Sequence, residues 1–318
     1  MIRPVLIAAS LGVAAVFVND ALAQGAWPQR PVRIVHGFDN GSNPDTLARL
    51  IAPSLGERLG QPIVVEGRPG AAGRIATAYV ATQPADGYTF IMLTAGDGVI
   101  AATDPKLAYD LLRDYAFSTQ VIQFEFLFVT GADSPLRSLA DLLDAARRNP
   151  GKLTFGTPGI ASTQHLAGEL LKSMANVDFQ HVPFKGTAIA DLLGGRIDMV
   201  IAAPAVVTPL IKGGKLRALA ATGRQRMGAL PETPVIGETI ADYEVSSWLG
   251  LATPVKTEPA IVDRMAAEVR RVIADETIAA RIRATGSEVA GTTPQAFRAR
   301  VEADVAKWKK VSAGLRLD

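Results

Sequence analysis

Apolar and amphipathic segments alternate along the chain after its first 23 residues. The segment 32–35 is short and β-branched, as in a strand, and leucine and isoleucine then recur at helical spacing over 47–59. The same order of strand and helix returns several times up to residue 221, and the C-terminal part is mostly helical. This alternation predicts an α/β protein with mostly parallel sheets covered by helices on both faces. The length suits two such sheets.

Three local patterns carry their own expectations. Pro53 and Gly56 lie inside the first helical pattern and predict a kinked or weakened helix. The strongly apolar run 124–130 predicts a single strand. The segment 96–101 matches G-x-G-x-x-A after a strand, but the sequence predicts no helix between it and Pro105, so dinucleotide binding is not favoured.

Two loops that follow predicted strands are the candidate binding sites, because ligands of open α/β sheets bind beyond the carboxyl ends of the strands. The loop 37–45 precedes the first helix, whose free N–H groups favour an anion. The loop 156–163 repeats this arrangement, and Ser162 and Thr163 can donate hydroxyl groups to a carboxylate. The alternative is that the polar residues of both loops only cap their helices. If the loops face each other, they form a polar cleft.

The N-terminus has the features of a secretory signal. Arg3 precedes an apolar run over 5–18, and the small-x-small site 21–23 follows. The run is too short to span a bilayer, although a short membrane anchor is the alternative. The sequence therefore predicts cleavage after Ala23 and export out of the cytoplasm, to a compartment where free nucleotide cofactors are scarce.

Composition excludes several classes of function. The 318 residues carry a formal net charge of +2, which argues against a nucleic-acid binder that depends on electrostatics. Cysteine is absent, which excludes disulfides, thiolate metal sites and thiol catalysis. No spacing of histidines or carboxylates predicts a metal site, and we expect no cofactor.

Enzyme motifs are few. The chain has three histidines and neither a G-x-S-x-G nor an H-E-x-x-H motif. A secreted hydrolase of a small ester or amide remains an alternative, in which Ser42 or Ser162 would pair with His36 or His165. A sensor that presents its bound ligand to a signalling partner is a further alternative.

Many short motifs in one order resemble the Bug-type periplasmic solute receptors of tripartite tricarboxylate transporters. The resemblance covers essentially the whole exported chain. It rests on segments 32–35, 65–73, 85–89, 109–110, 149–154, 165–170, 181–186, 191–198, 214–220 and 248–251, together with Phe38, Gly41 and Asp45.

The resemblance implies a two-lobed receptor that closes on a small organic carboxylate: a di- or tricarboxylate, an aromatic acid or an amino acid. The first lobe would comprise 24–125 and 248–318, and the second lobe 126–247. The receptor would deliver its ligand to the membrane subunits of the transporter, without chemistry on the ligand. It would act as a monomer and without nucleic acid.

The resemblance also implies the ligand-binding residues, by position. In the first lobe they are Phe38, Asn40, Gly41, Ser42, Asn43, Asp45, Thr94, Gly96 and Asp97. In the second lobe they are Thr157, Pro158, Gly159, Ser162, Thr163, His165, Lys185, Gly186, Ala203 and Pro204.

The sequence departs from the family at three places near the expected ligand. The segment 39–42 stands where the family has Pro-Pro-Gly-Gly, so Asp39 adds a negative charge and should point away or meet a positive group of the ligand. Asp97, if buried beside the ligand, would favour an amine, a hydroxyl donor or a protonated carboxyl. The stretch after Gly186 is about two residues shorter than usual in the family, by comparison of the motifs.

Overall fold

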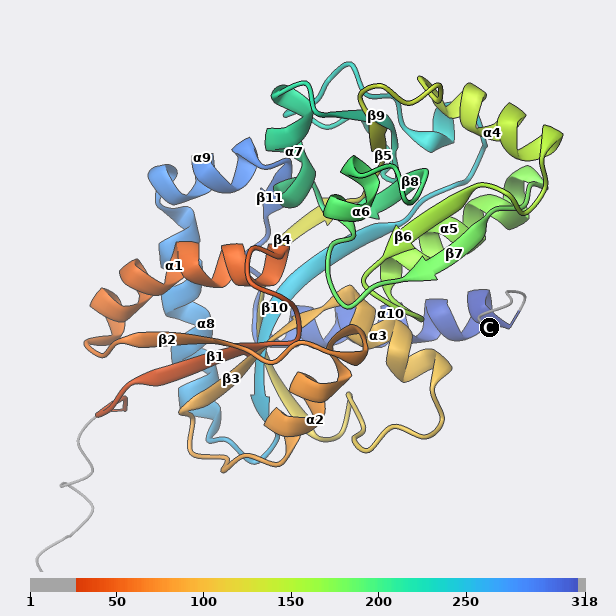
Figure 1. Ribbon diagram of the computed structural model, residues 1–318. Coiled ribbons are helices and arrows are strands. Elements are labelled where there is room, and N and C mark those ends of the chain that lie inside the picture. The colour runs from red at the N-terminus through yellow and green to blue at the C-terminus, as the bar shows by residue number, and fades with distance from the viewer. Residues whose placement is uncertain (1–26, 314–318) are drawn as a thin grey trace, which may run out of the picture.

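The molecule has two lobes, each built around one β-sheet (Figure 1). The structure is a computed structural model that describes residues 27–313, so the predicted signal peptide and its cleavage site lie outside the described residues. The first sheet has six strands in the order β11-β4-β10-β3-β1-β2, and the second has five in the order β7-β6-β8-β5-β9. Lobe 1 and lobe 2 are the lobes built on these two sheets.

Lobe 1 takes its elements from both ends of the chain. Its strands are β1 (Val32–His36), β2 (Ile63–Gly67), β3 (Thr89–Thr94), β4 (Tyr115–Glu125), β10 (Ser246–Pro254) and β11 (Ser287–Val289). Its helices are α1 (Asn43–Leu59), η2 (Ala71–Gly73), α2 (Arg74–Ala81), α3 (Ala95–Thr103), α8 (Pro259–Ala274), α9 (Glu276–Ala284) and α10 (Pro294–Ser312).

Lobe 2 is formed by one continuous stretch of the chain. Its strands are β5 (Leu127–Gly131), β6 (Thr154–Thr157), β7 (Gln180–Pro183), β8 (Met199–Ala202) and β9 (Leu216–Ala221). Its helices are α4 (Leu139–Arg148), α5 (Thr163–Ala175), α6 (Ile189–Leu193), α7 (Pro204–Lys212) and η3 (Ile236–Glu238).

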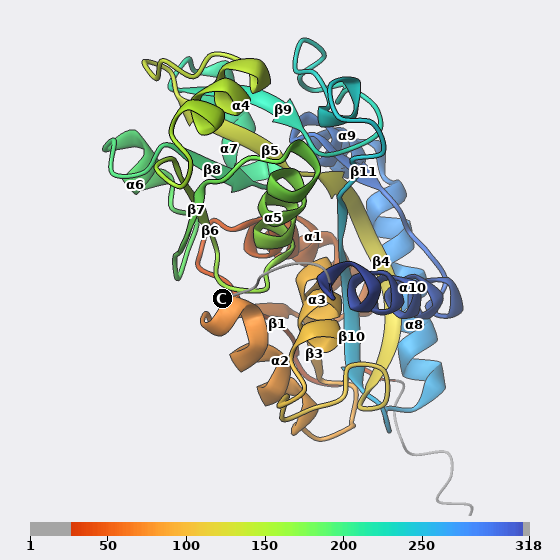
Figure 2. The ribbon, with the colours of Figure 1, turned by 90° about the vertical axis from the view of Figure 1, so that its right-hand side faces the viewer.

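Helices cover both faces of the lobe 1 sheet, because its strands are apolar on both sides. Ile34 of β1 belongs to the core formed with α1 and α8, whereas its neighbour Val35 belongs to the core formed with α2 and α10. Adjacent strand residues point to opposite faces, so both must be apolar when both faces are buried. β1 pairs with β2 and β3 in parallel, while β10 pairs with β3 and β4 antiparallel. Figure 2 shows the long β4 and β10 rising toward lobe 2.

Two segments of the chain cross between the lobes, and Thr222 connects them. The first crossing is at Phe126, between β4 and β5. The second is at Val245, where the chain leaves lobe 2 and enters β10. The Thr222 hydroxyl accepts a hydrogen bond from the Phe126 N–H at 2.9 Å and donates one to the Val245 carbonyl at 2.6 Å. Their backbones also pair, since the Thr222 N–H donates to the Phe126 carbonyl. The two crossings therefore form one hydrogen-bonded junction.

The structure corrects two local expectations and one about the sheets. The run 124–130 is not one strand but the end of β4 and the start of β5, because the chain changes sheets at Phe126. The glycines at 96 and 98 lie within a helix, α3, at whose start the Asp97 carboxylate accepts a hydrogen bond from the N–H of the N-cap residue Thr94. The sheets are mixed rather than mostly parallel, since β10 pairs antiparallel with β3 and β4, and β5 with β8 and β9. Helix α1 includes Pro53 and continues to Leu59. Among the described residues, no helix is long and apolar enough to cross a membrane.

Candidate functional site

A cavity lies between the lobes, where both sheets present the carboxyl ends of strands. Lobe 1 contributes Phe38, Asp39, Ser42, Asn43, Pro44, Ala72, Thr94, Gly96, Phe124, Ser247 and Leu249; the crossing contributes Phe126; lobe 2 contributes Pro158, Ser162, Thr163, Gln164, Gly186, Thr187, Ile201, Ala202, Ala203 and Val206. The lobes touch beside it, since a Cβ on Gly159 would lie 3.4 Å from the Ala72 Cβ.

Four helices begin at this cavity. Each follows a strand directly: α1 follows β1, α3 follows β3, α5 follows β6 and α7 follows β8. The cavity wall includes residues from the first turn or the N-cap of all four, namely Asn43, Gly96, Thr163 and Ala203. The N-terminus of a helix carries a partial positive charge and unpaired N–H groups. The convergence of four such ends, two from each lobe, favours a bound anion.

Three buried polar side chains in the cavity wall have no hydrogen-bond partner among residues 27–313. They are the Ser42 hydroxyl, the Asn43 amide nitrogen Nδ2 and the Thr163 hydroxyl, and each residue is at most 6% exposed. A buried polar group without a hydrogen bond costs free energy, so such groups in a protein interior usually have a partner. These three lie at the starts of α1 and α5, in opposite lobes. They are therefore suited to hydrogen-bonding one guest from both sides.

Asp45 supports the lobe 1 loop from behind. Its carboxylate accepts hydrogen bonds from the Gly41 N–H at 2.8 Å and from Arg49 Nε at 2.8 Å, and lies 3.1 Å from His36 Nε2. Burial opposes ionisation of Asp45, but the Gly41 hydrogen bond and the charge of Arg49 prevail and lower its pKa. Burial lowers the pKa of His36, so its neutral ring donates the Nε2 proton to the carboxylate. The Ser42 side chain, at the N-cap of α1, makes no capping hydrogen bond.

A pair of neutral histidines supports the lobe 2 loop. The rings of His165 and His181 stack with their centroids 3.8 Å apart. The Ala161 N–H donates to His165 Nδ1 at 3.1 Å, and His181 Nε2 lies 2.6 Å from the Thr157 hydroxyl. Burial lowers the pKa of His165 to about 4, helped by the charge of Lys172, and burial together with His165 lowers that of His181 to about 3. Both rings are therefore uncharged at neutral pH.

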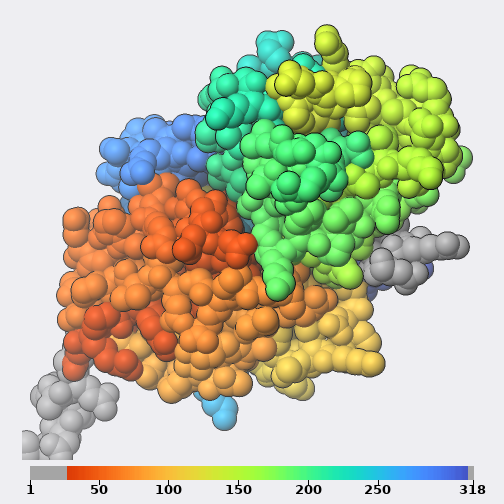
Figure 3. Space-filling view, viewed as in Figure 1, coloured from red at the N-terminus to blue at the C-terminus, as the bar shows by residue number. Residues whose placement is uncertain are grey.

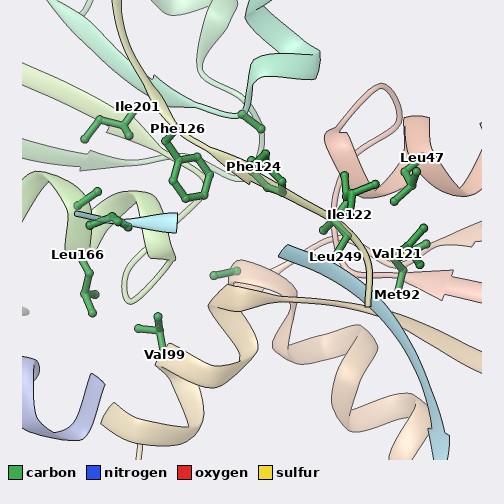
Figure 4. Packing of buried hydrophobic residues seen from close by; sticks show 14 of the residues in the cluster. Leu47, Met92, Val99, Val121, Ile122, Phe124, Phe126, Leu166, Ile201 and Leu249 are labelled. Carbon is green, nitrogen blue, oxygen red and sulfur yellow. The ribbon is translucent and has the colours of Figure 1, made fainter. Parts of the chain in front are cut away.

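The remaining wall of the cavity is apolar. Phe124 and Phe126 pack edge to face, with ring centroids 5.3 Å apart. Figure 4 shows Phe126 between Phe124 and Ile201. Lysine, arginine and histidine are absent from the described lining, and Asp39 is its one charged residue. An anion in this cavity would be held by helix ends and neutral donors rather than by a counter-charge.

Comparison with known proteins identifies the family to which this chain belongs. The sequence profile described as the tripartite tricarboxylate transporter family receptor matches residues 47–317. This chain belongs to that receptor family.

Relatives and solved structures agree with this assignment. A UPF0065 protein from the tcbD-tcbE intergenic region of Pseudomonas sp. (strain P51) is 34% identical over 92% of this chain and 88% of its own length. The structure of R. palustris Rpa4515 with adipate is 37% identical, with a TM-score of 0.86 over 90% of this chain and 97% of that one. The periplasmic binding protein BugD is 29% identical, with a TM-score of 0.86 over 90% and 98%. The Bug-type resemblance and the two-lobed α/β fold are thereby confirmed.

The receptor's structure places ten of the predicted ligand residues in the cavity wall. They are Phe38, Ser42, Asn43, Thr94, Gly96, Pro158, Ser162, Thr163, Gly186 and Ala203. Nine others lie outside the wall: Asn40, Gly41, Asp45, Asp97, Thr157, Gly159, His165, Lys185 and Pro204. Several of these nine support the wall instead, as Asp45 and His165 do.

Asp97 is one of the supporting residues. Its buried carboxylate accepts hydrogen bonds from Thr77 Oγ1 at 2.7 Å and from the N–H and hydroxyl of Thr94 at 2.8 and 3.1 Å. Burial raises its pKa, although the hydrogen bonds act in the opposite direction. These contacts hold the start of α3 in place. They account for a buried aspartate at this position without any contact to a ligand.

The sequence did not indicate the apolar lining. Phe124 of β4, Phe126 at the crossing and Leu249 of β10 look like ordinary core residues in the sequence. Ala72 lies in the glycine-rich segment 67–73, which in the sequence contributes only to the family resemblance. Only the crossing of the chain at Phe126 brings these side chains together.

The serine–histidine pairs required by a hydrolase are not formed among residues 27–313. The Ser162 hydroxyl accepts a hydrogen bond from the His165 backbone N–H, and the Ser42 hydroxyl has no partner. Neither hydroxyl is hydrogen-bonded to an imidazole, so the structure gives neither serine a general base.

Proposed function

We propose that this receptor captures a small organic carboxylate in the periplasm and passes it, as a monomer, to the membrane subunits of a tripartite transporter. The observation that carries the proposal is the set of three buried, unpartnered polar side chains at the helix ends of both lobes. The adipate found with the R. palustris relative supports a carboxylate as the ligand class. The apolar wall beyond the helix ends suits a carbon chain or ring.

Binding would act by differential stabilisation of the closed receptor. Ser42 and Asn43 belong to lobe 1 and Thr163 to lobe 2, so a carboxylate meets both sets of donors only when the lobes are together. A ligand that binds the closed form better shifts the population toward it. The junction at Thr222 links both crossings, so it is where the lobes would turn. The closed form is then the one that the transporter would recognise.

Titration calorimetry with mono-, di- and tricarboxylates tests the proposal. Thr163→Val keeps the side-chain shape but removes the unpartnered hydroxyl, and should weaken binding of the best acid about tenfold, as expected for one hydrogen bond to a charged group. Ser173→Ala, on the exposed face of the same helix, is the matched control and should bind like the wild type. A folded wild-type protein that binds no carboxylate in the panel would contradict the proposal.

A further inference from the structure

Asp39 is the one charged side chain in the described wall of the cavity. The backbone carbonyl of Asp39 accepts a hydrogen bond from the Ser42 N–H at 3.1 Å, which fixes the residue at the turn before α1. Its half-buried carboxylate makes no hydrogen bond or ion pair within residues 27–313. A negative charge in the cavity wall is therefore left without a partner.

The Asp39 carboxylate reaches across to lobe 2. It lies against Gly186, in the segment between β7 and α6, so closely that a Cβ on Gly186 would require the Asp39 carboxylate to move. Thr187, the next residue, also lines the cavity. In Figure 3 a green projection of lobe 2, in the colour of this part of the chain, rests on the orange surface of lobe 1. Asp39 and this segment thus meet at the boundary between the lobes.

The helix N-termini and the Asp39 carboxylate, which both line the cavity, attract different chemical groups of a ligand. The helix ends at Asn43, Gly96 and Thr163 favour a carboxylate, whereas the Asp39 carboxylate repels a second one and attracts a hydrogen-bond donor. The lining offers no cation that could neutralise a second carboxylate. Repulsion of this kind is a common means of excluding a competing ligand.

We infer that Asp39 determines specificity: the receptor selects an acid with one carboxylate and, at the end that meets Asp39, an ammonium or hydroxyl group, and it discriminates against dicarboxylates. This inference rests on the proposed function and narrows its ligand class.

The test uses straight-chain acids of three to eight carbons, each length as the diacid, the ω-hydroxy acid and the ω-amino acid. A thermal-shift screen finds the length that fits, and calorimetry then compares the three end groups at that length. The proteins are the wild type, Asp39→Asn, and Asp133→Asn as a control. Asp133 is exposed and outside the cavity, so its replacement changes the net charge equally.

At the fitting length, the wild type and Asp133→Asn should bind the ω-amino or ω-hydroxy acid about tenfold more tightly than the diacid. Asp39→Asn should abolish this preference, mainly by binding the diacid better. A wild type that prefers the diacid, or an unchanged preference in Asp39→Asn, would overturn the inference and leave the proposed function intact. A folded wild type that binds none of the acids would contradict both.

Discussion

The two loops that precede α1 and α5 occupy equivalent positions in the two lobes but are stabilised by different residues. In lobe 1 a buried carboxylate, Asp45, holds the loop and the N-cap hydroxyl of Ser42 stays free. In lobe 2 two uncharged histidines hold the loop, and the N-cap hydroxyl of Ser162 is used to cap the helix. The free hydroxyl is there one residue further on, at Thr163. In each loop, therefore, one hydroxyl is free for a ligand while other residues make the hydrogen bonds that hold the loop in place.

Removal of the lobe 1 carboxylate should have the largest effect. Asp45→Ala leaves the Gly41 N–H and the His36 ring without their acceptor, and should lower the free energy of unfolding by about 2–4 kcal/mol. Ligand affinity should fall as well, because Ser42 and Asn43 lose their fixed positions. Urea denaturation measures the first effect and calorimetry the second. Asp263→Ala, at an exposed site, should change neither; equal losses in both variants would refute the role of Asp45.

Acid should weaken lobe 2 through its histidines. The pKa values of His165 and His181 in the folded protein, about 4 and about 3, lie below the ordinary value of 6.5. The unfolded chain therefore takes up protons first, so the stability present above pH 6.5 is lost as the pH falls toward 4. His165→Asn keeps an acceptor for the Ala161 N–H but does not titrate.

Denaturation at several pH values measures this effect. The slope of the unfolding free energy against pH between 6.5 and 4 should decrease in His165→Asn by up to about 1.4 kcal/mol per pH unit, which is the loss of one titrating proton. Thr277→Ser, an exposed change outside lobe 2, provides the control. An undiminished slope in His165→Asn would show that this histidine does not titrate as described.

The sequence predicted the strand–loop–helix units of both lobes, because glycine, polar caps and apolar periodicity are local signals. It also predicted ten residues of the cavity wall on the strength of the family resemblance. It could not separate a capping or supporting role from ligand contact at Asp45, Asp97 and His165, since each role calls for the same residue type. Phe124, Phe126 and Leu249 were not predicted to line the cavity, because apolar residues beside the lobe boundaries have the same sequence pattern as ordinary core residues.

Ser42 and Ser162 give the most direct test of the account, although the changes are small. Ser42→Ala removes a buried, unpartnered hydroxyl, so it should not lower the free energy of unfolding, and it should weaken ligand binding about tenfold. Ser162→Ala removes the cap of α5 and should cost about 1 kcal/mol of stability, with the smaller effect on affinity. We predict that urea denaturation will show the larger loss of stability in Ser162→Ala, and that calorimetry will show the larger loss of affinity in Ser42→Ala. Lost stability with unchanged affinity in Ser42→Ala would contradict a ligand held by that free hydroxyl.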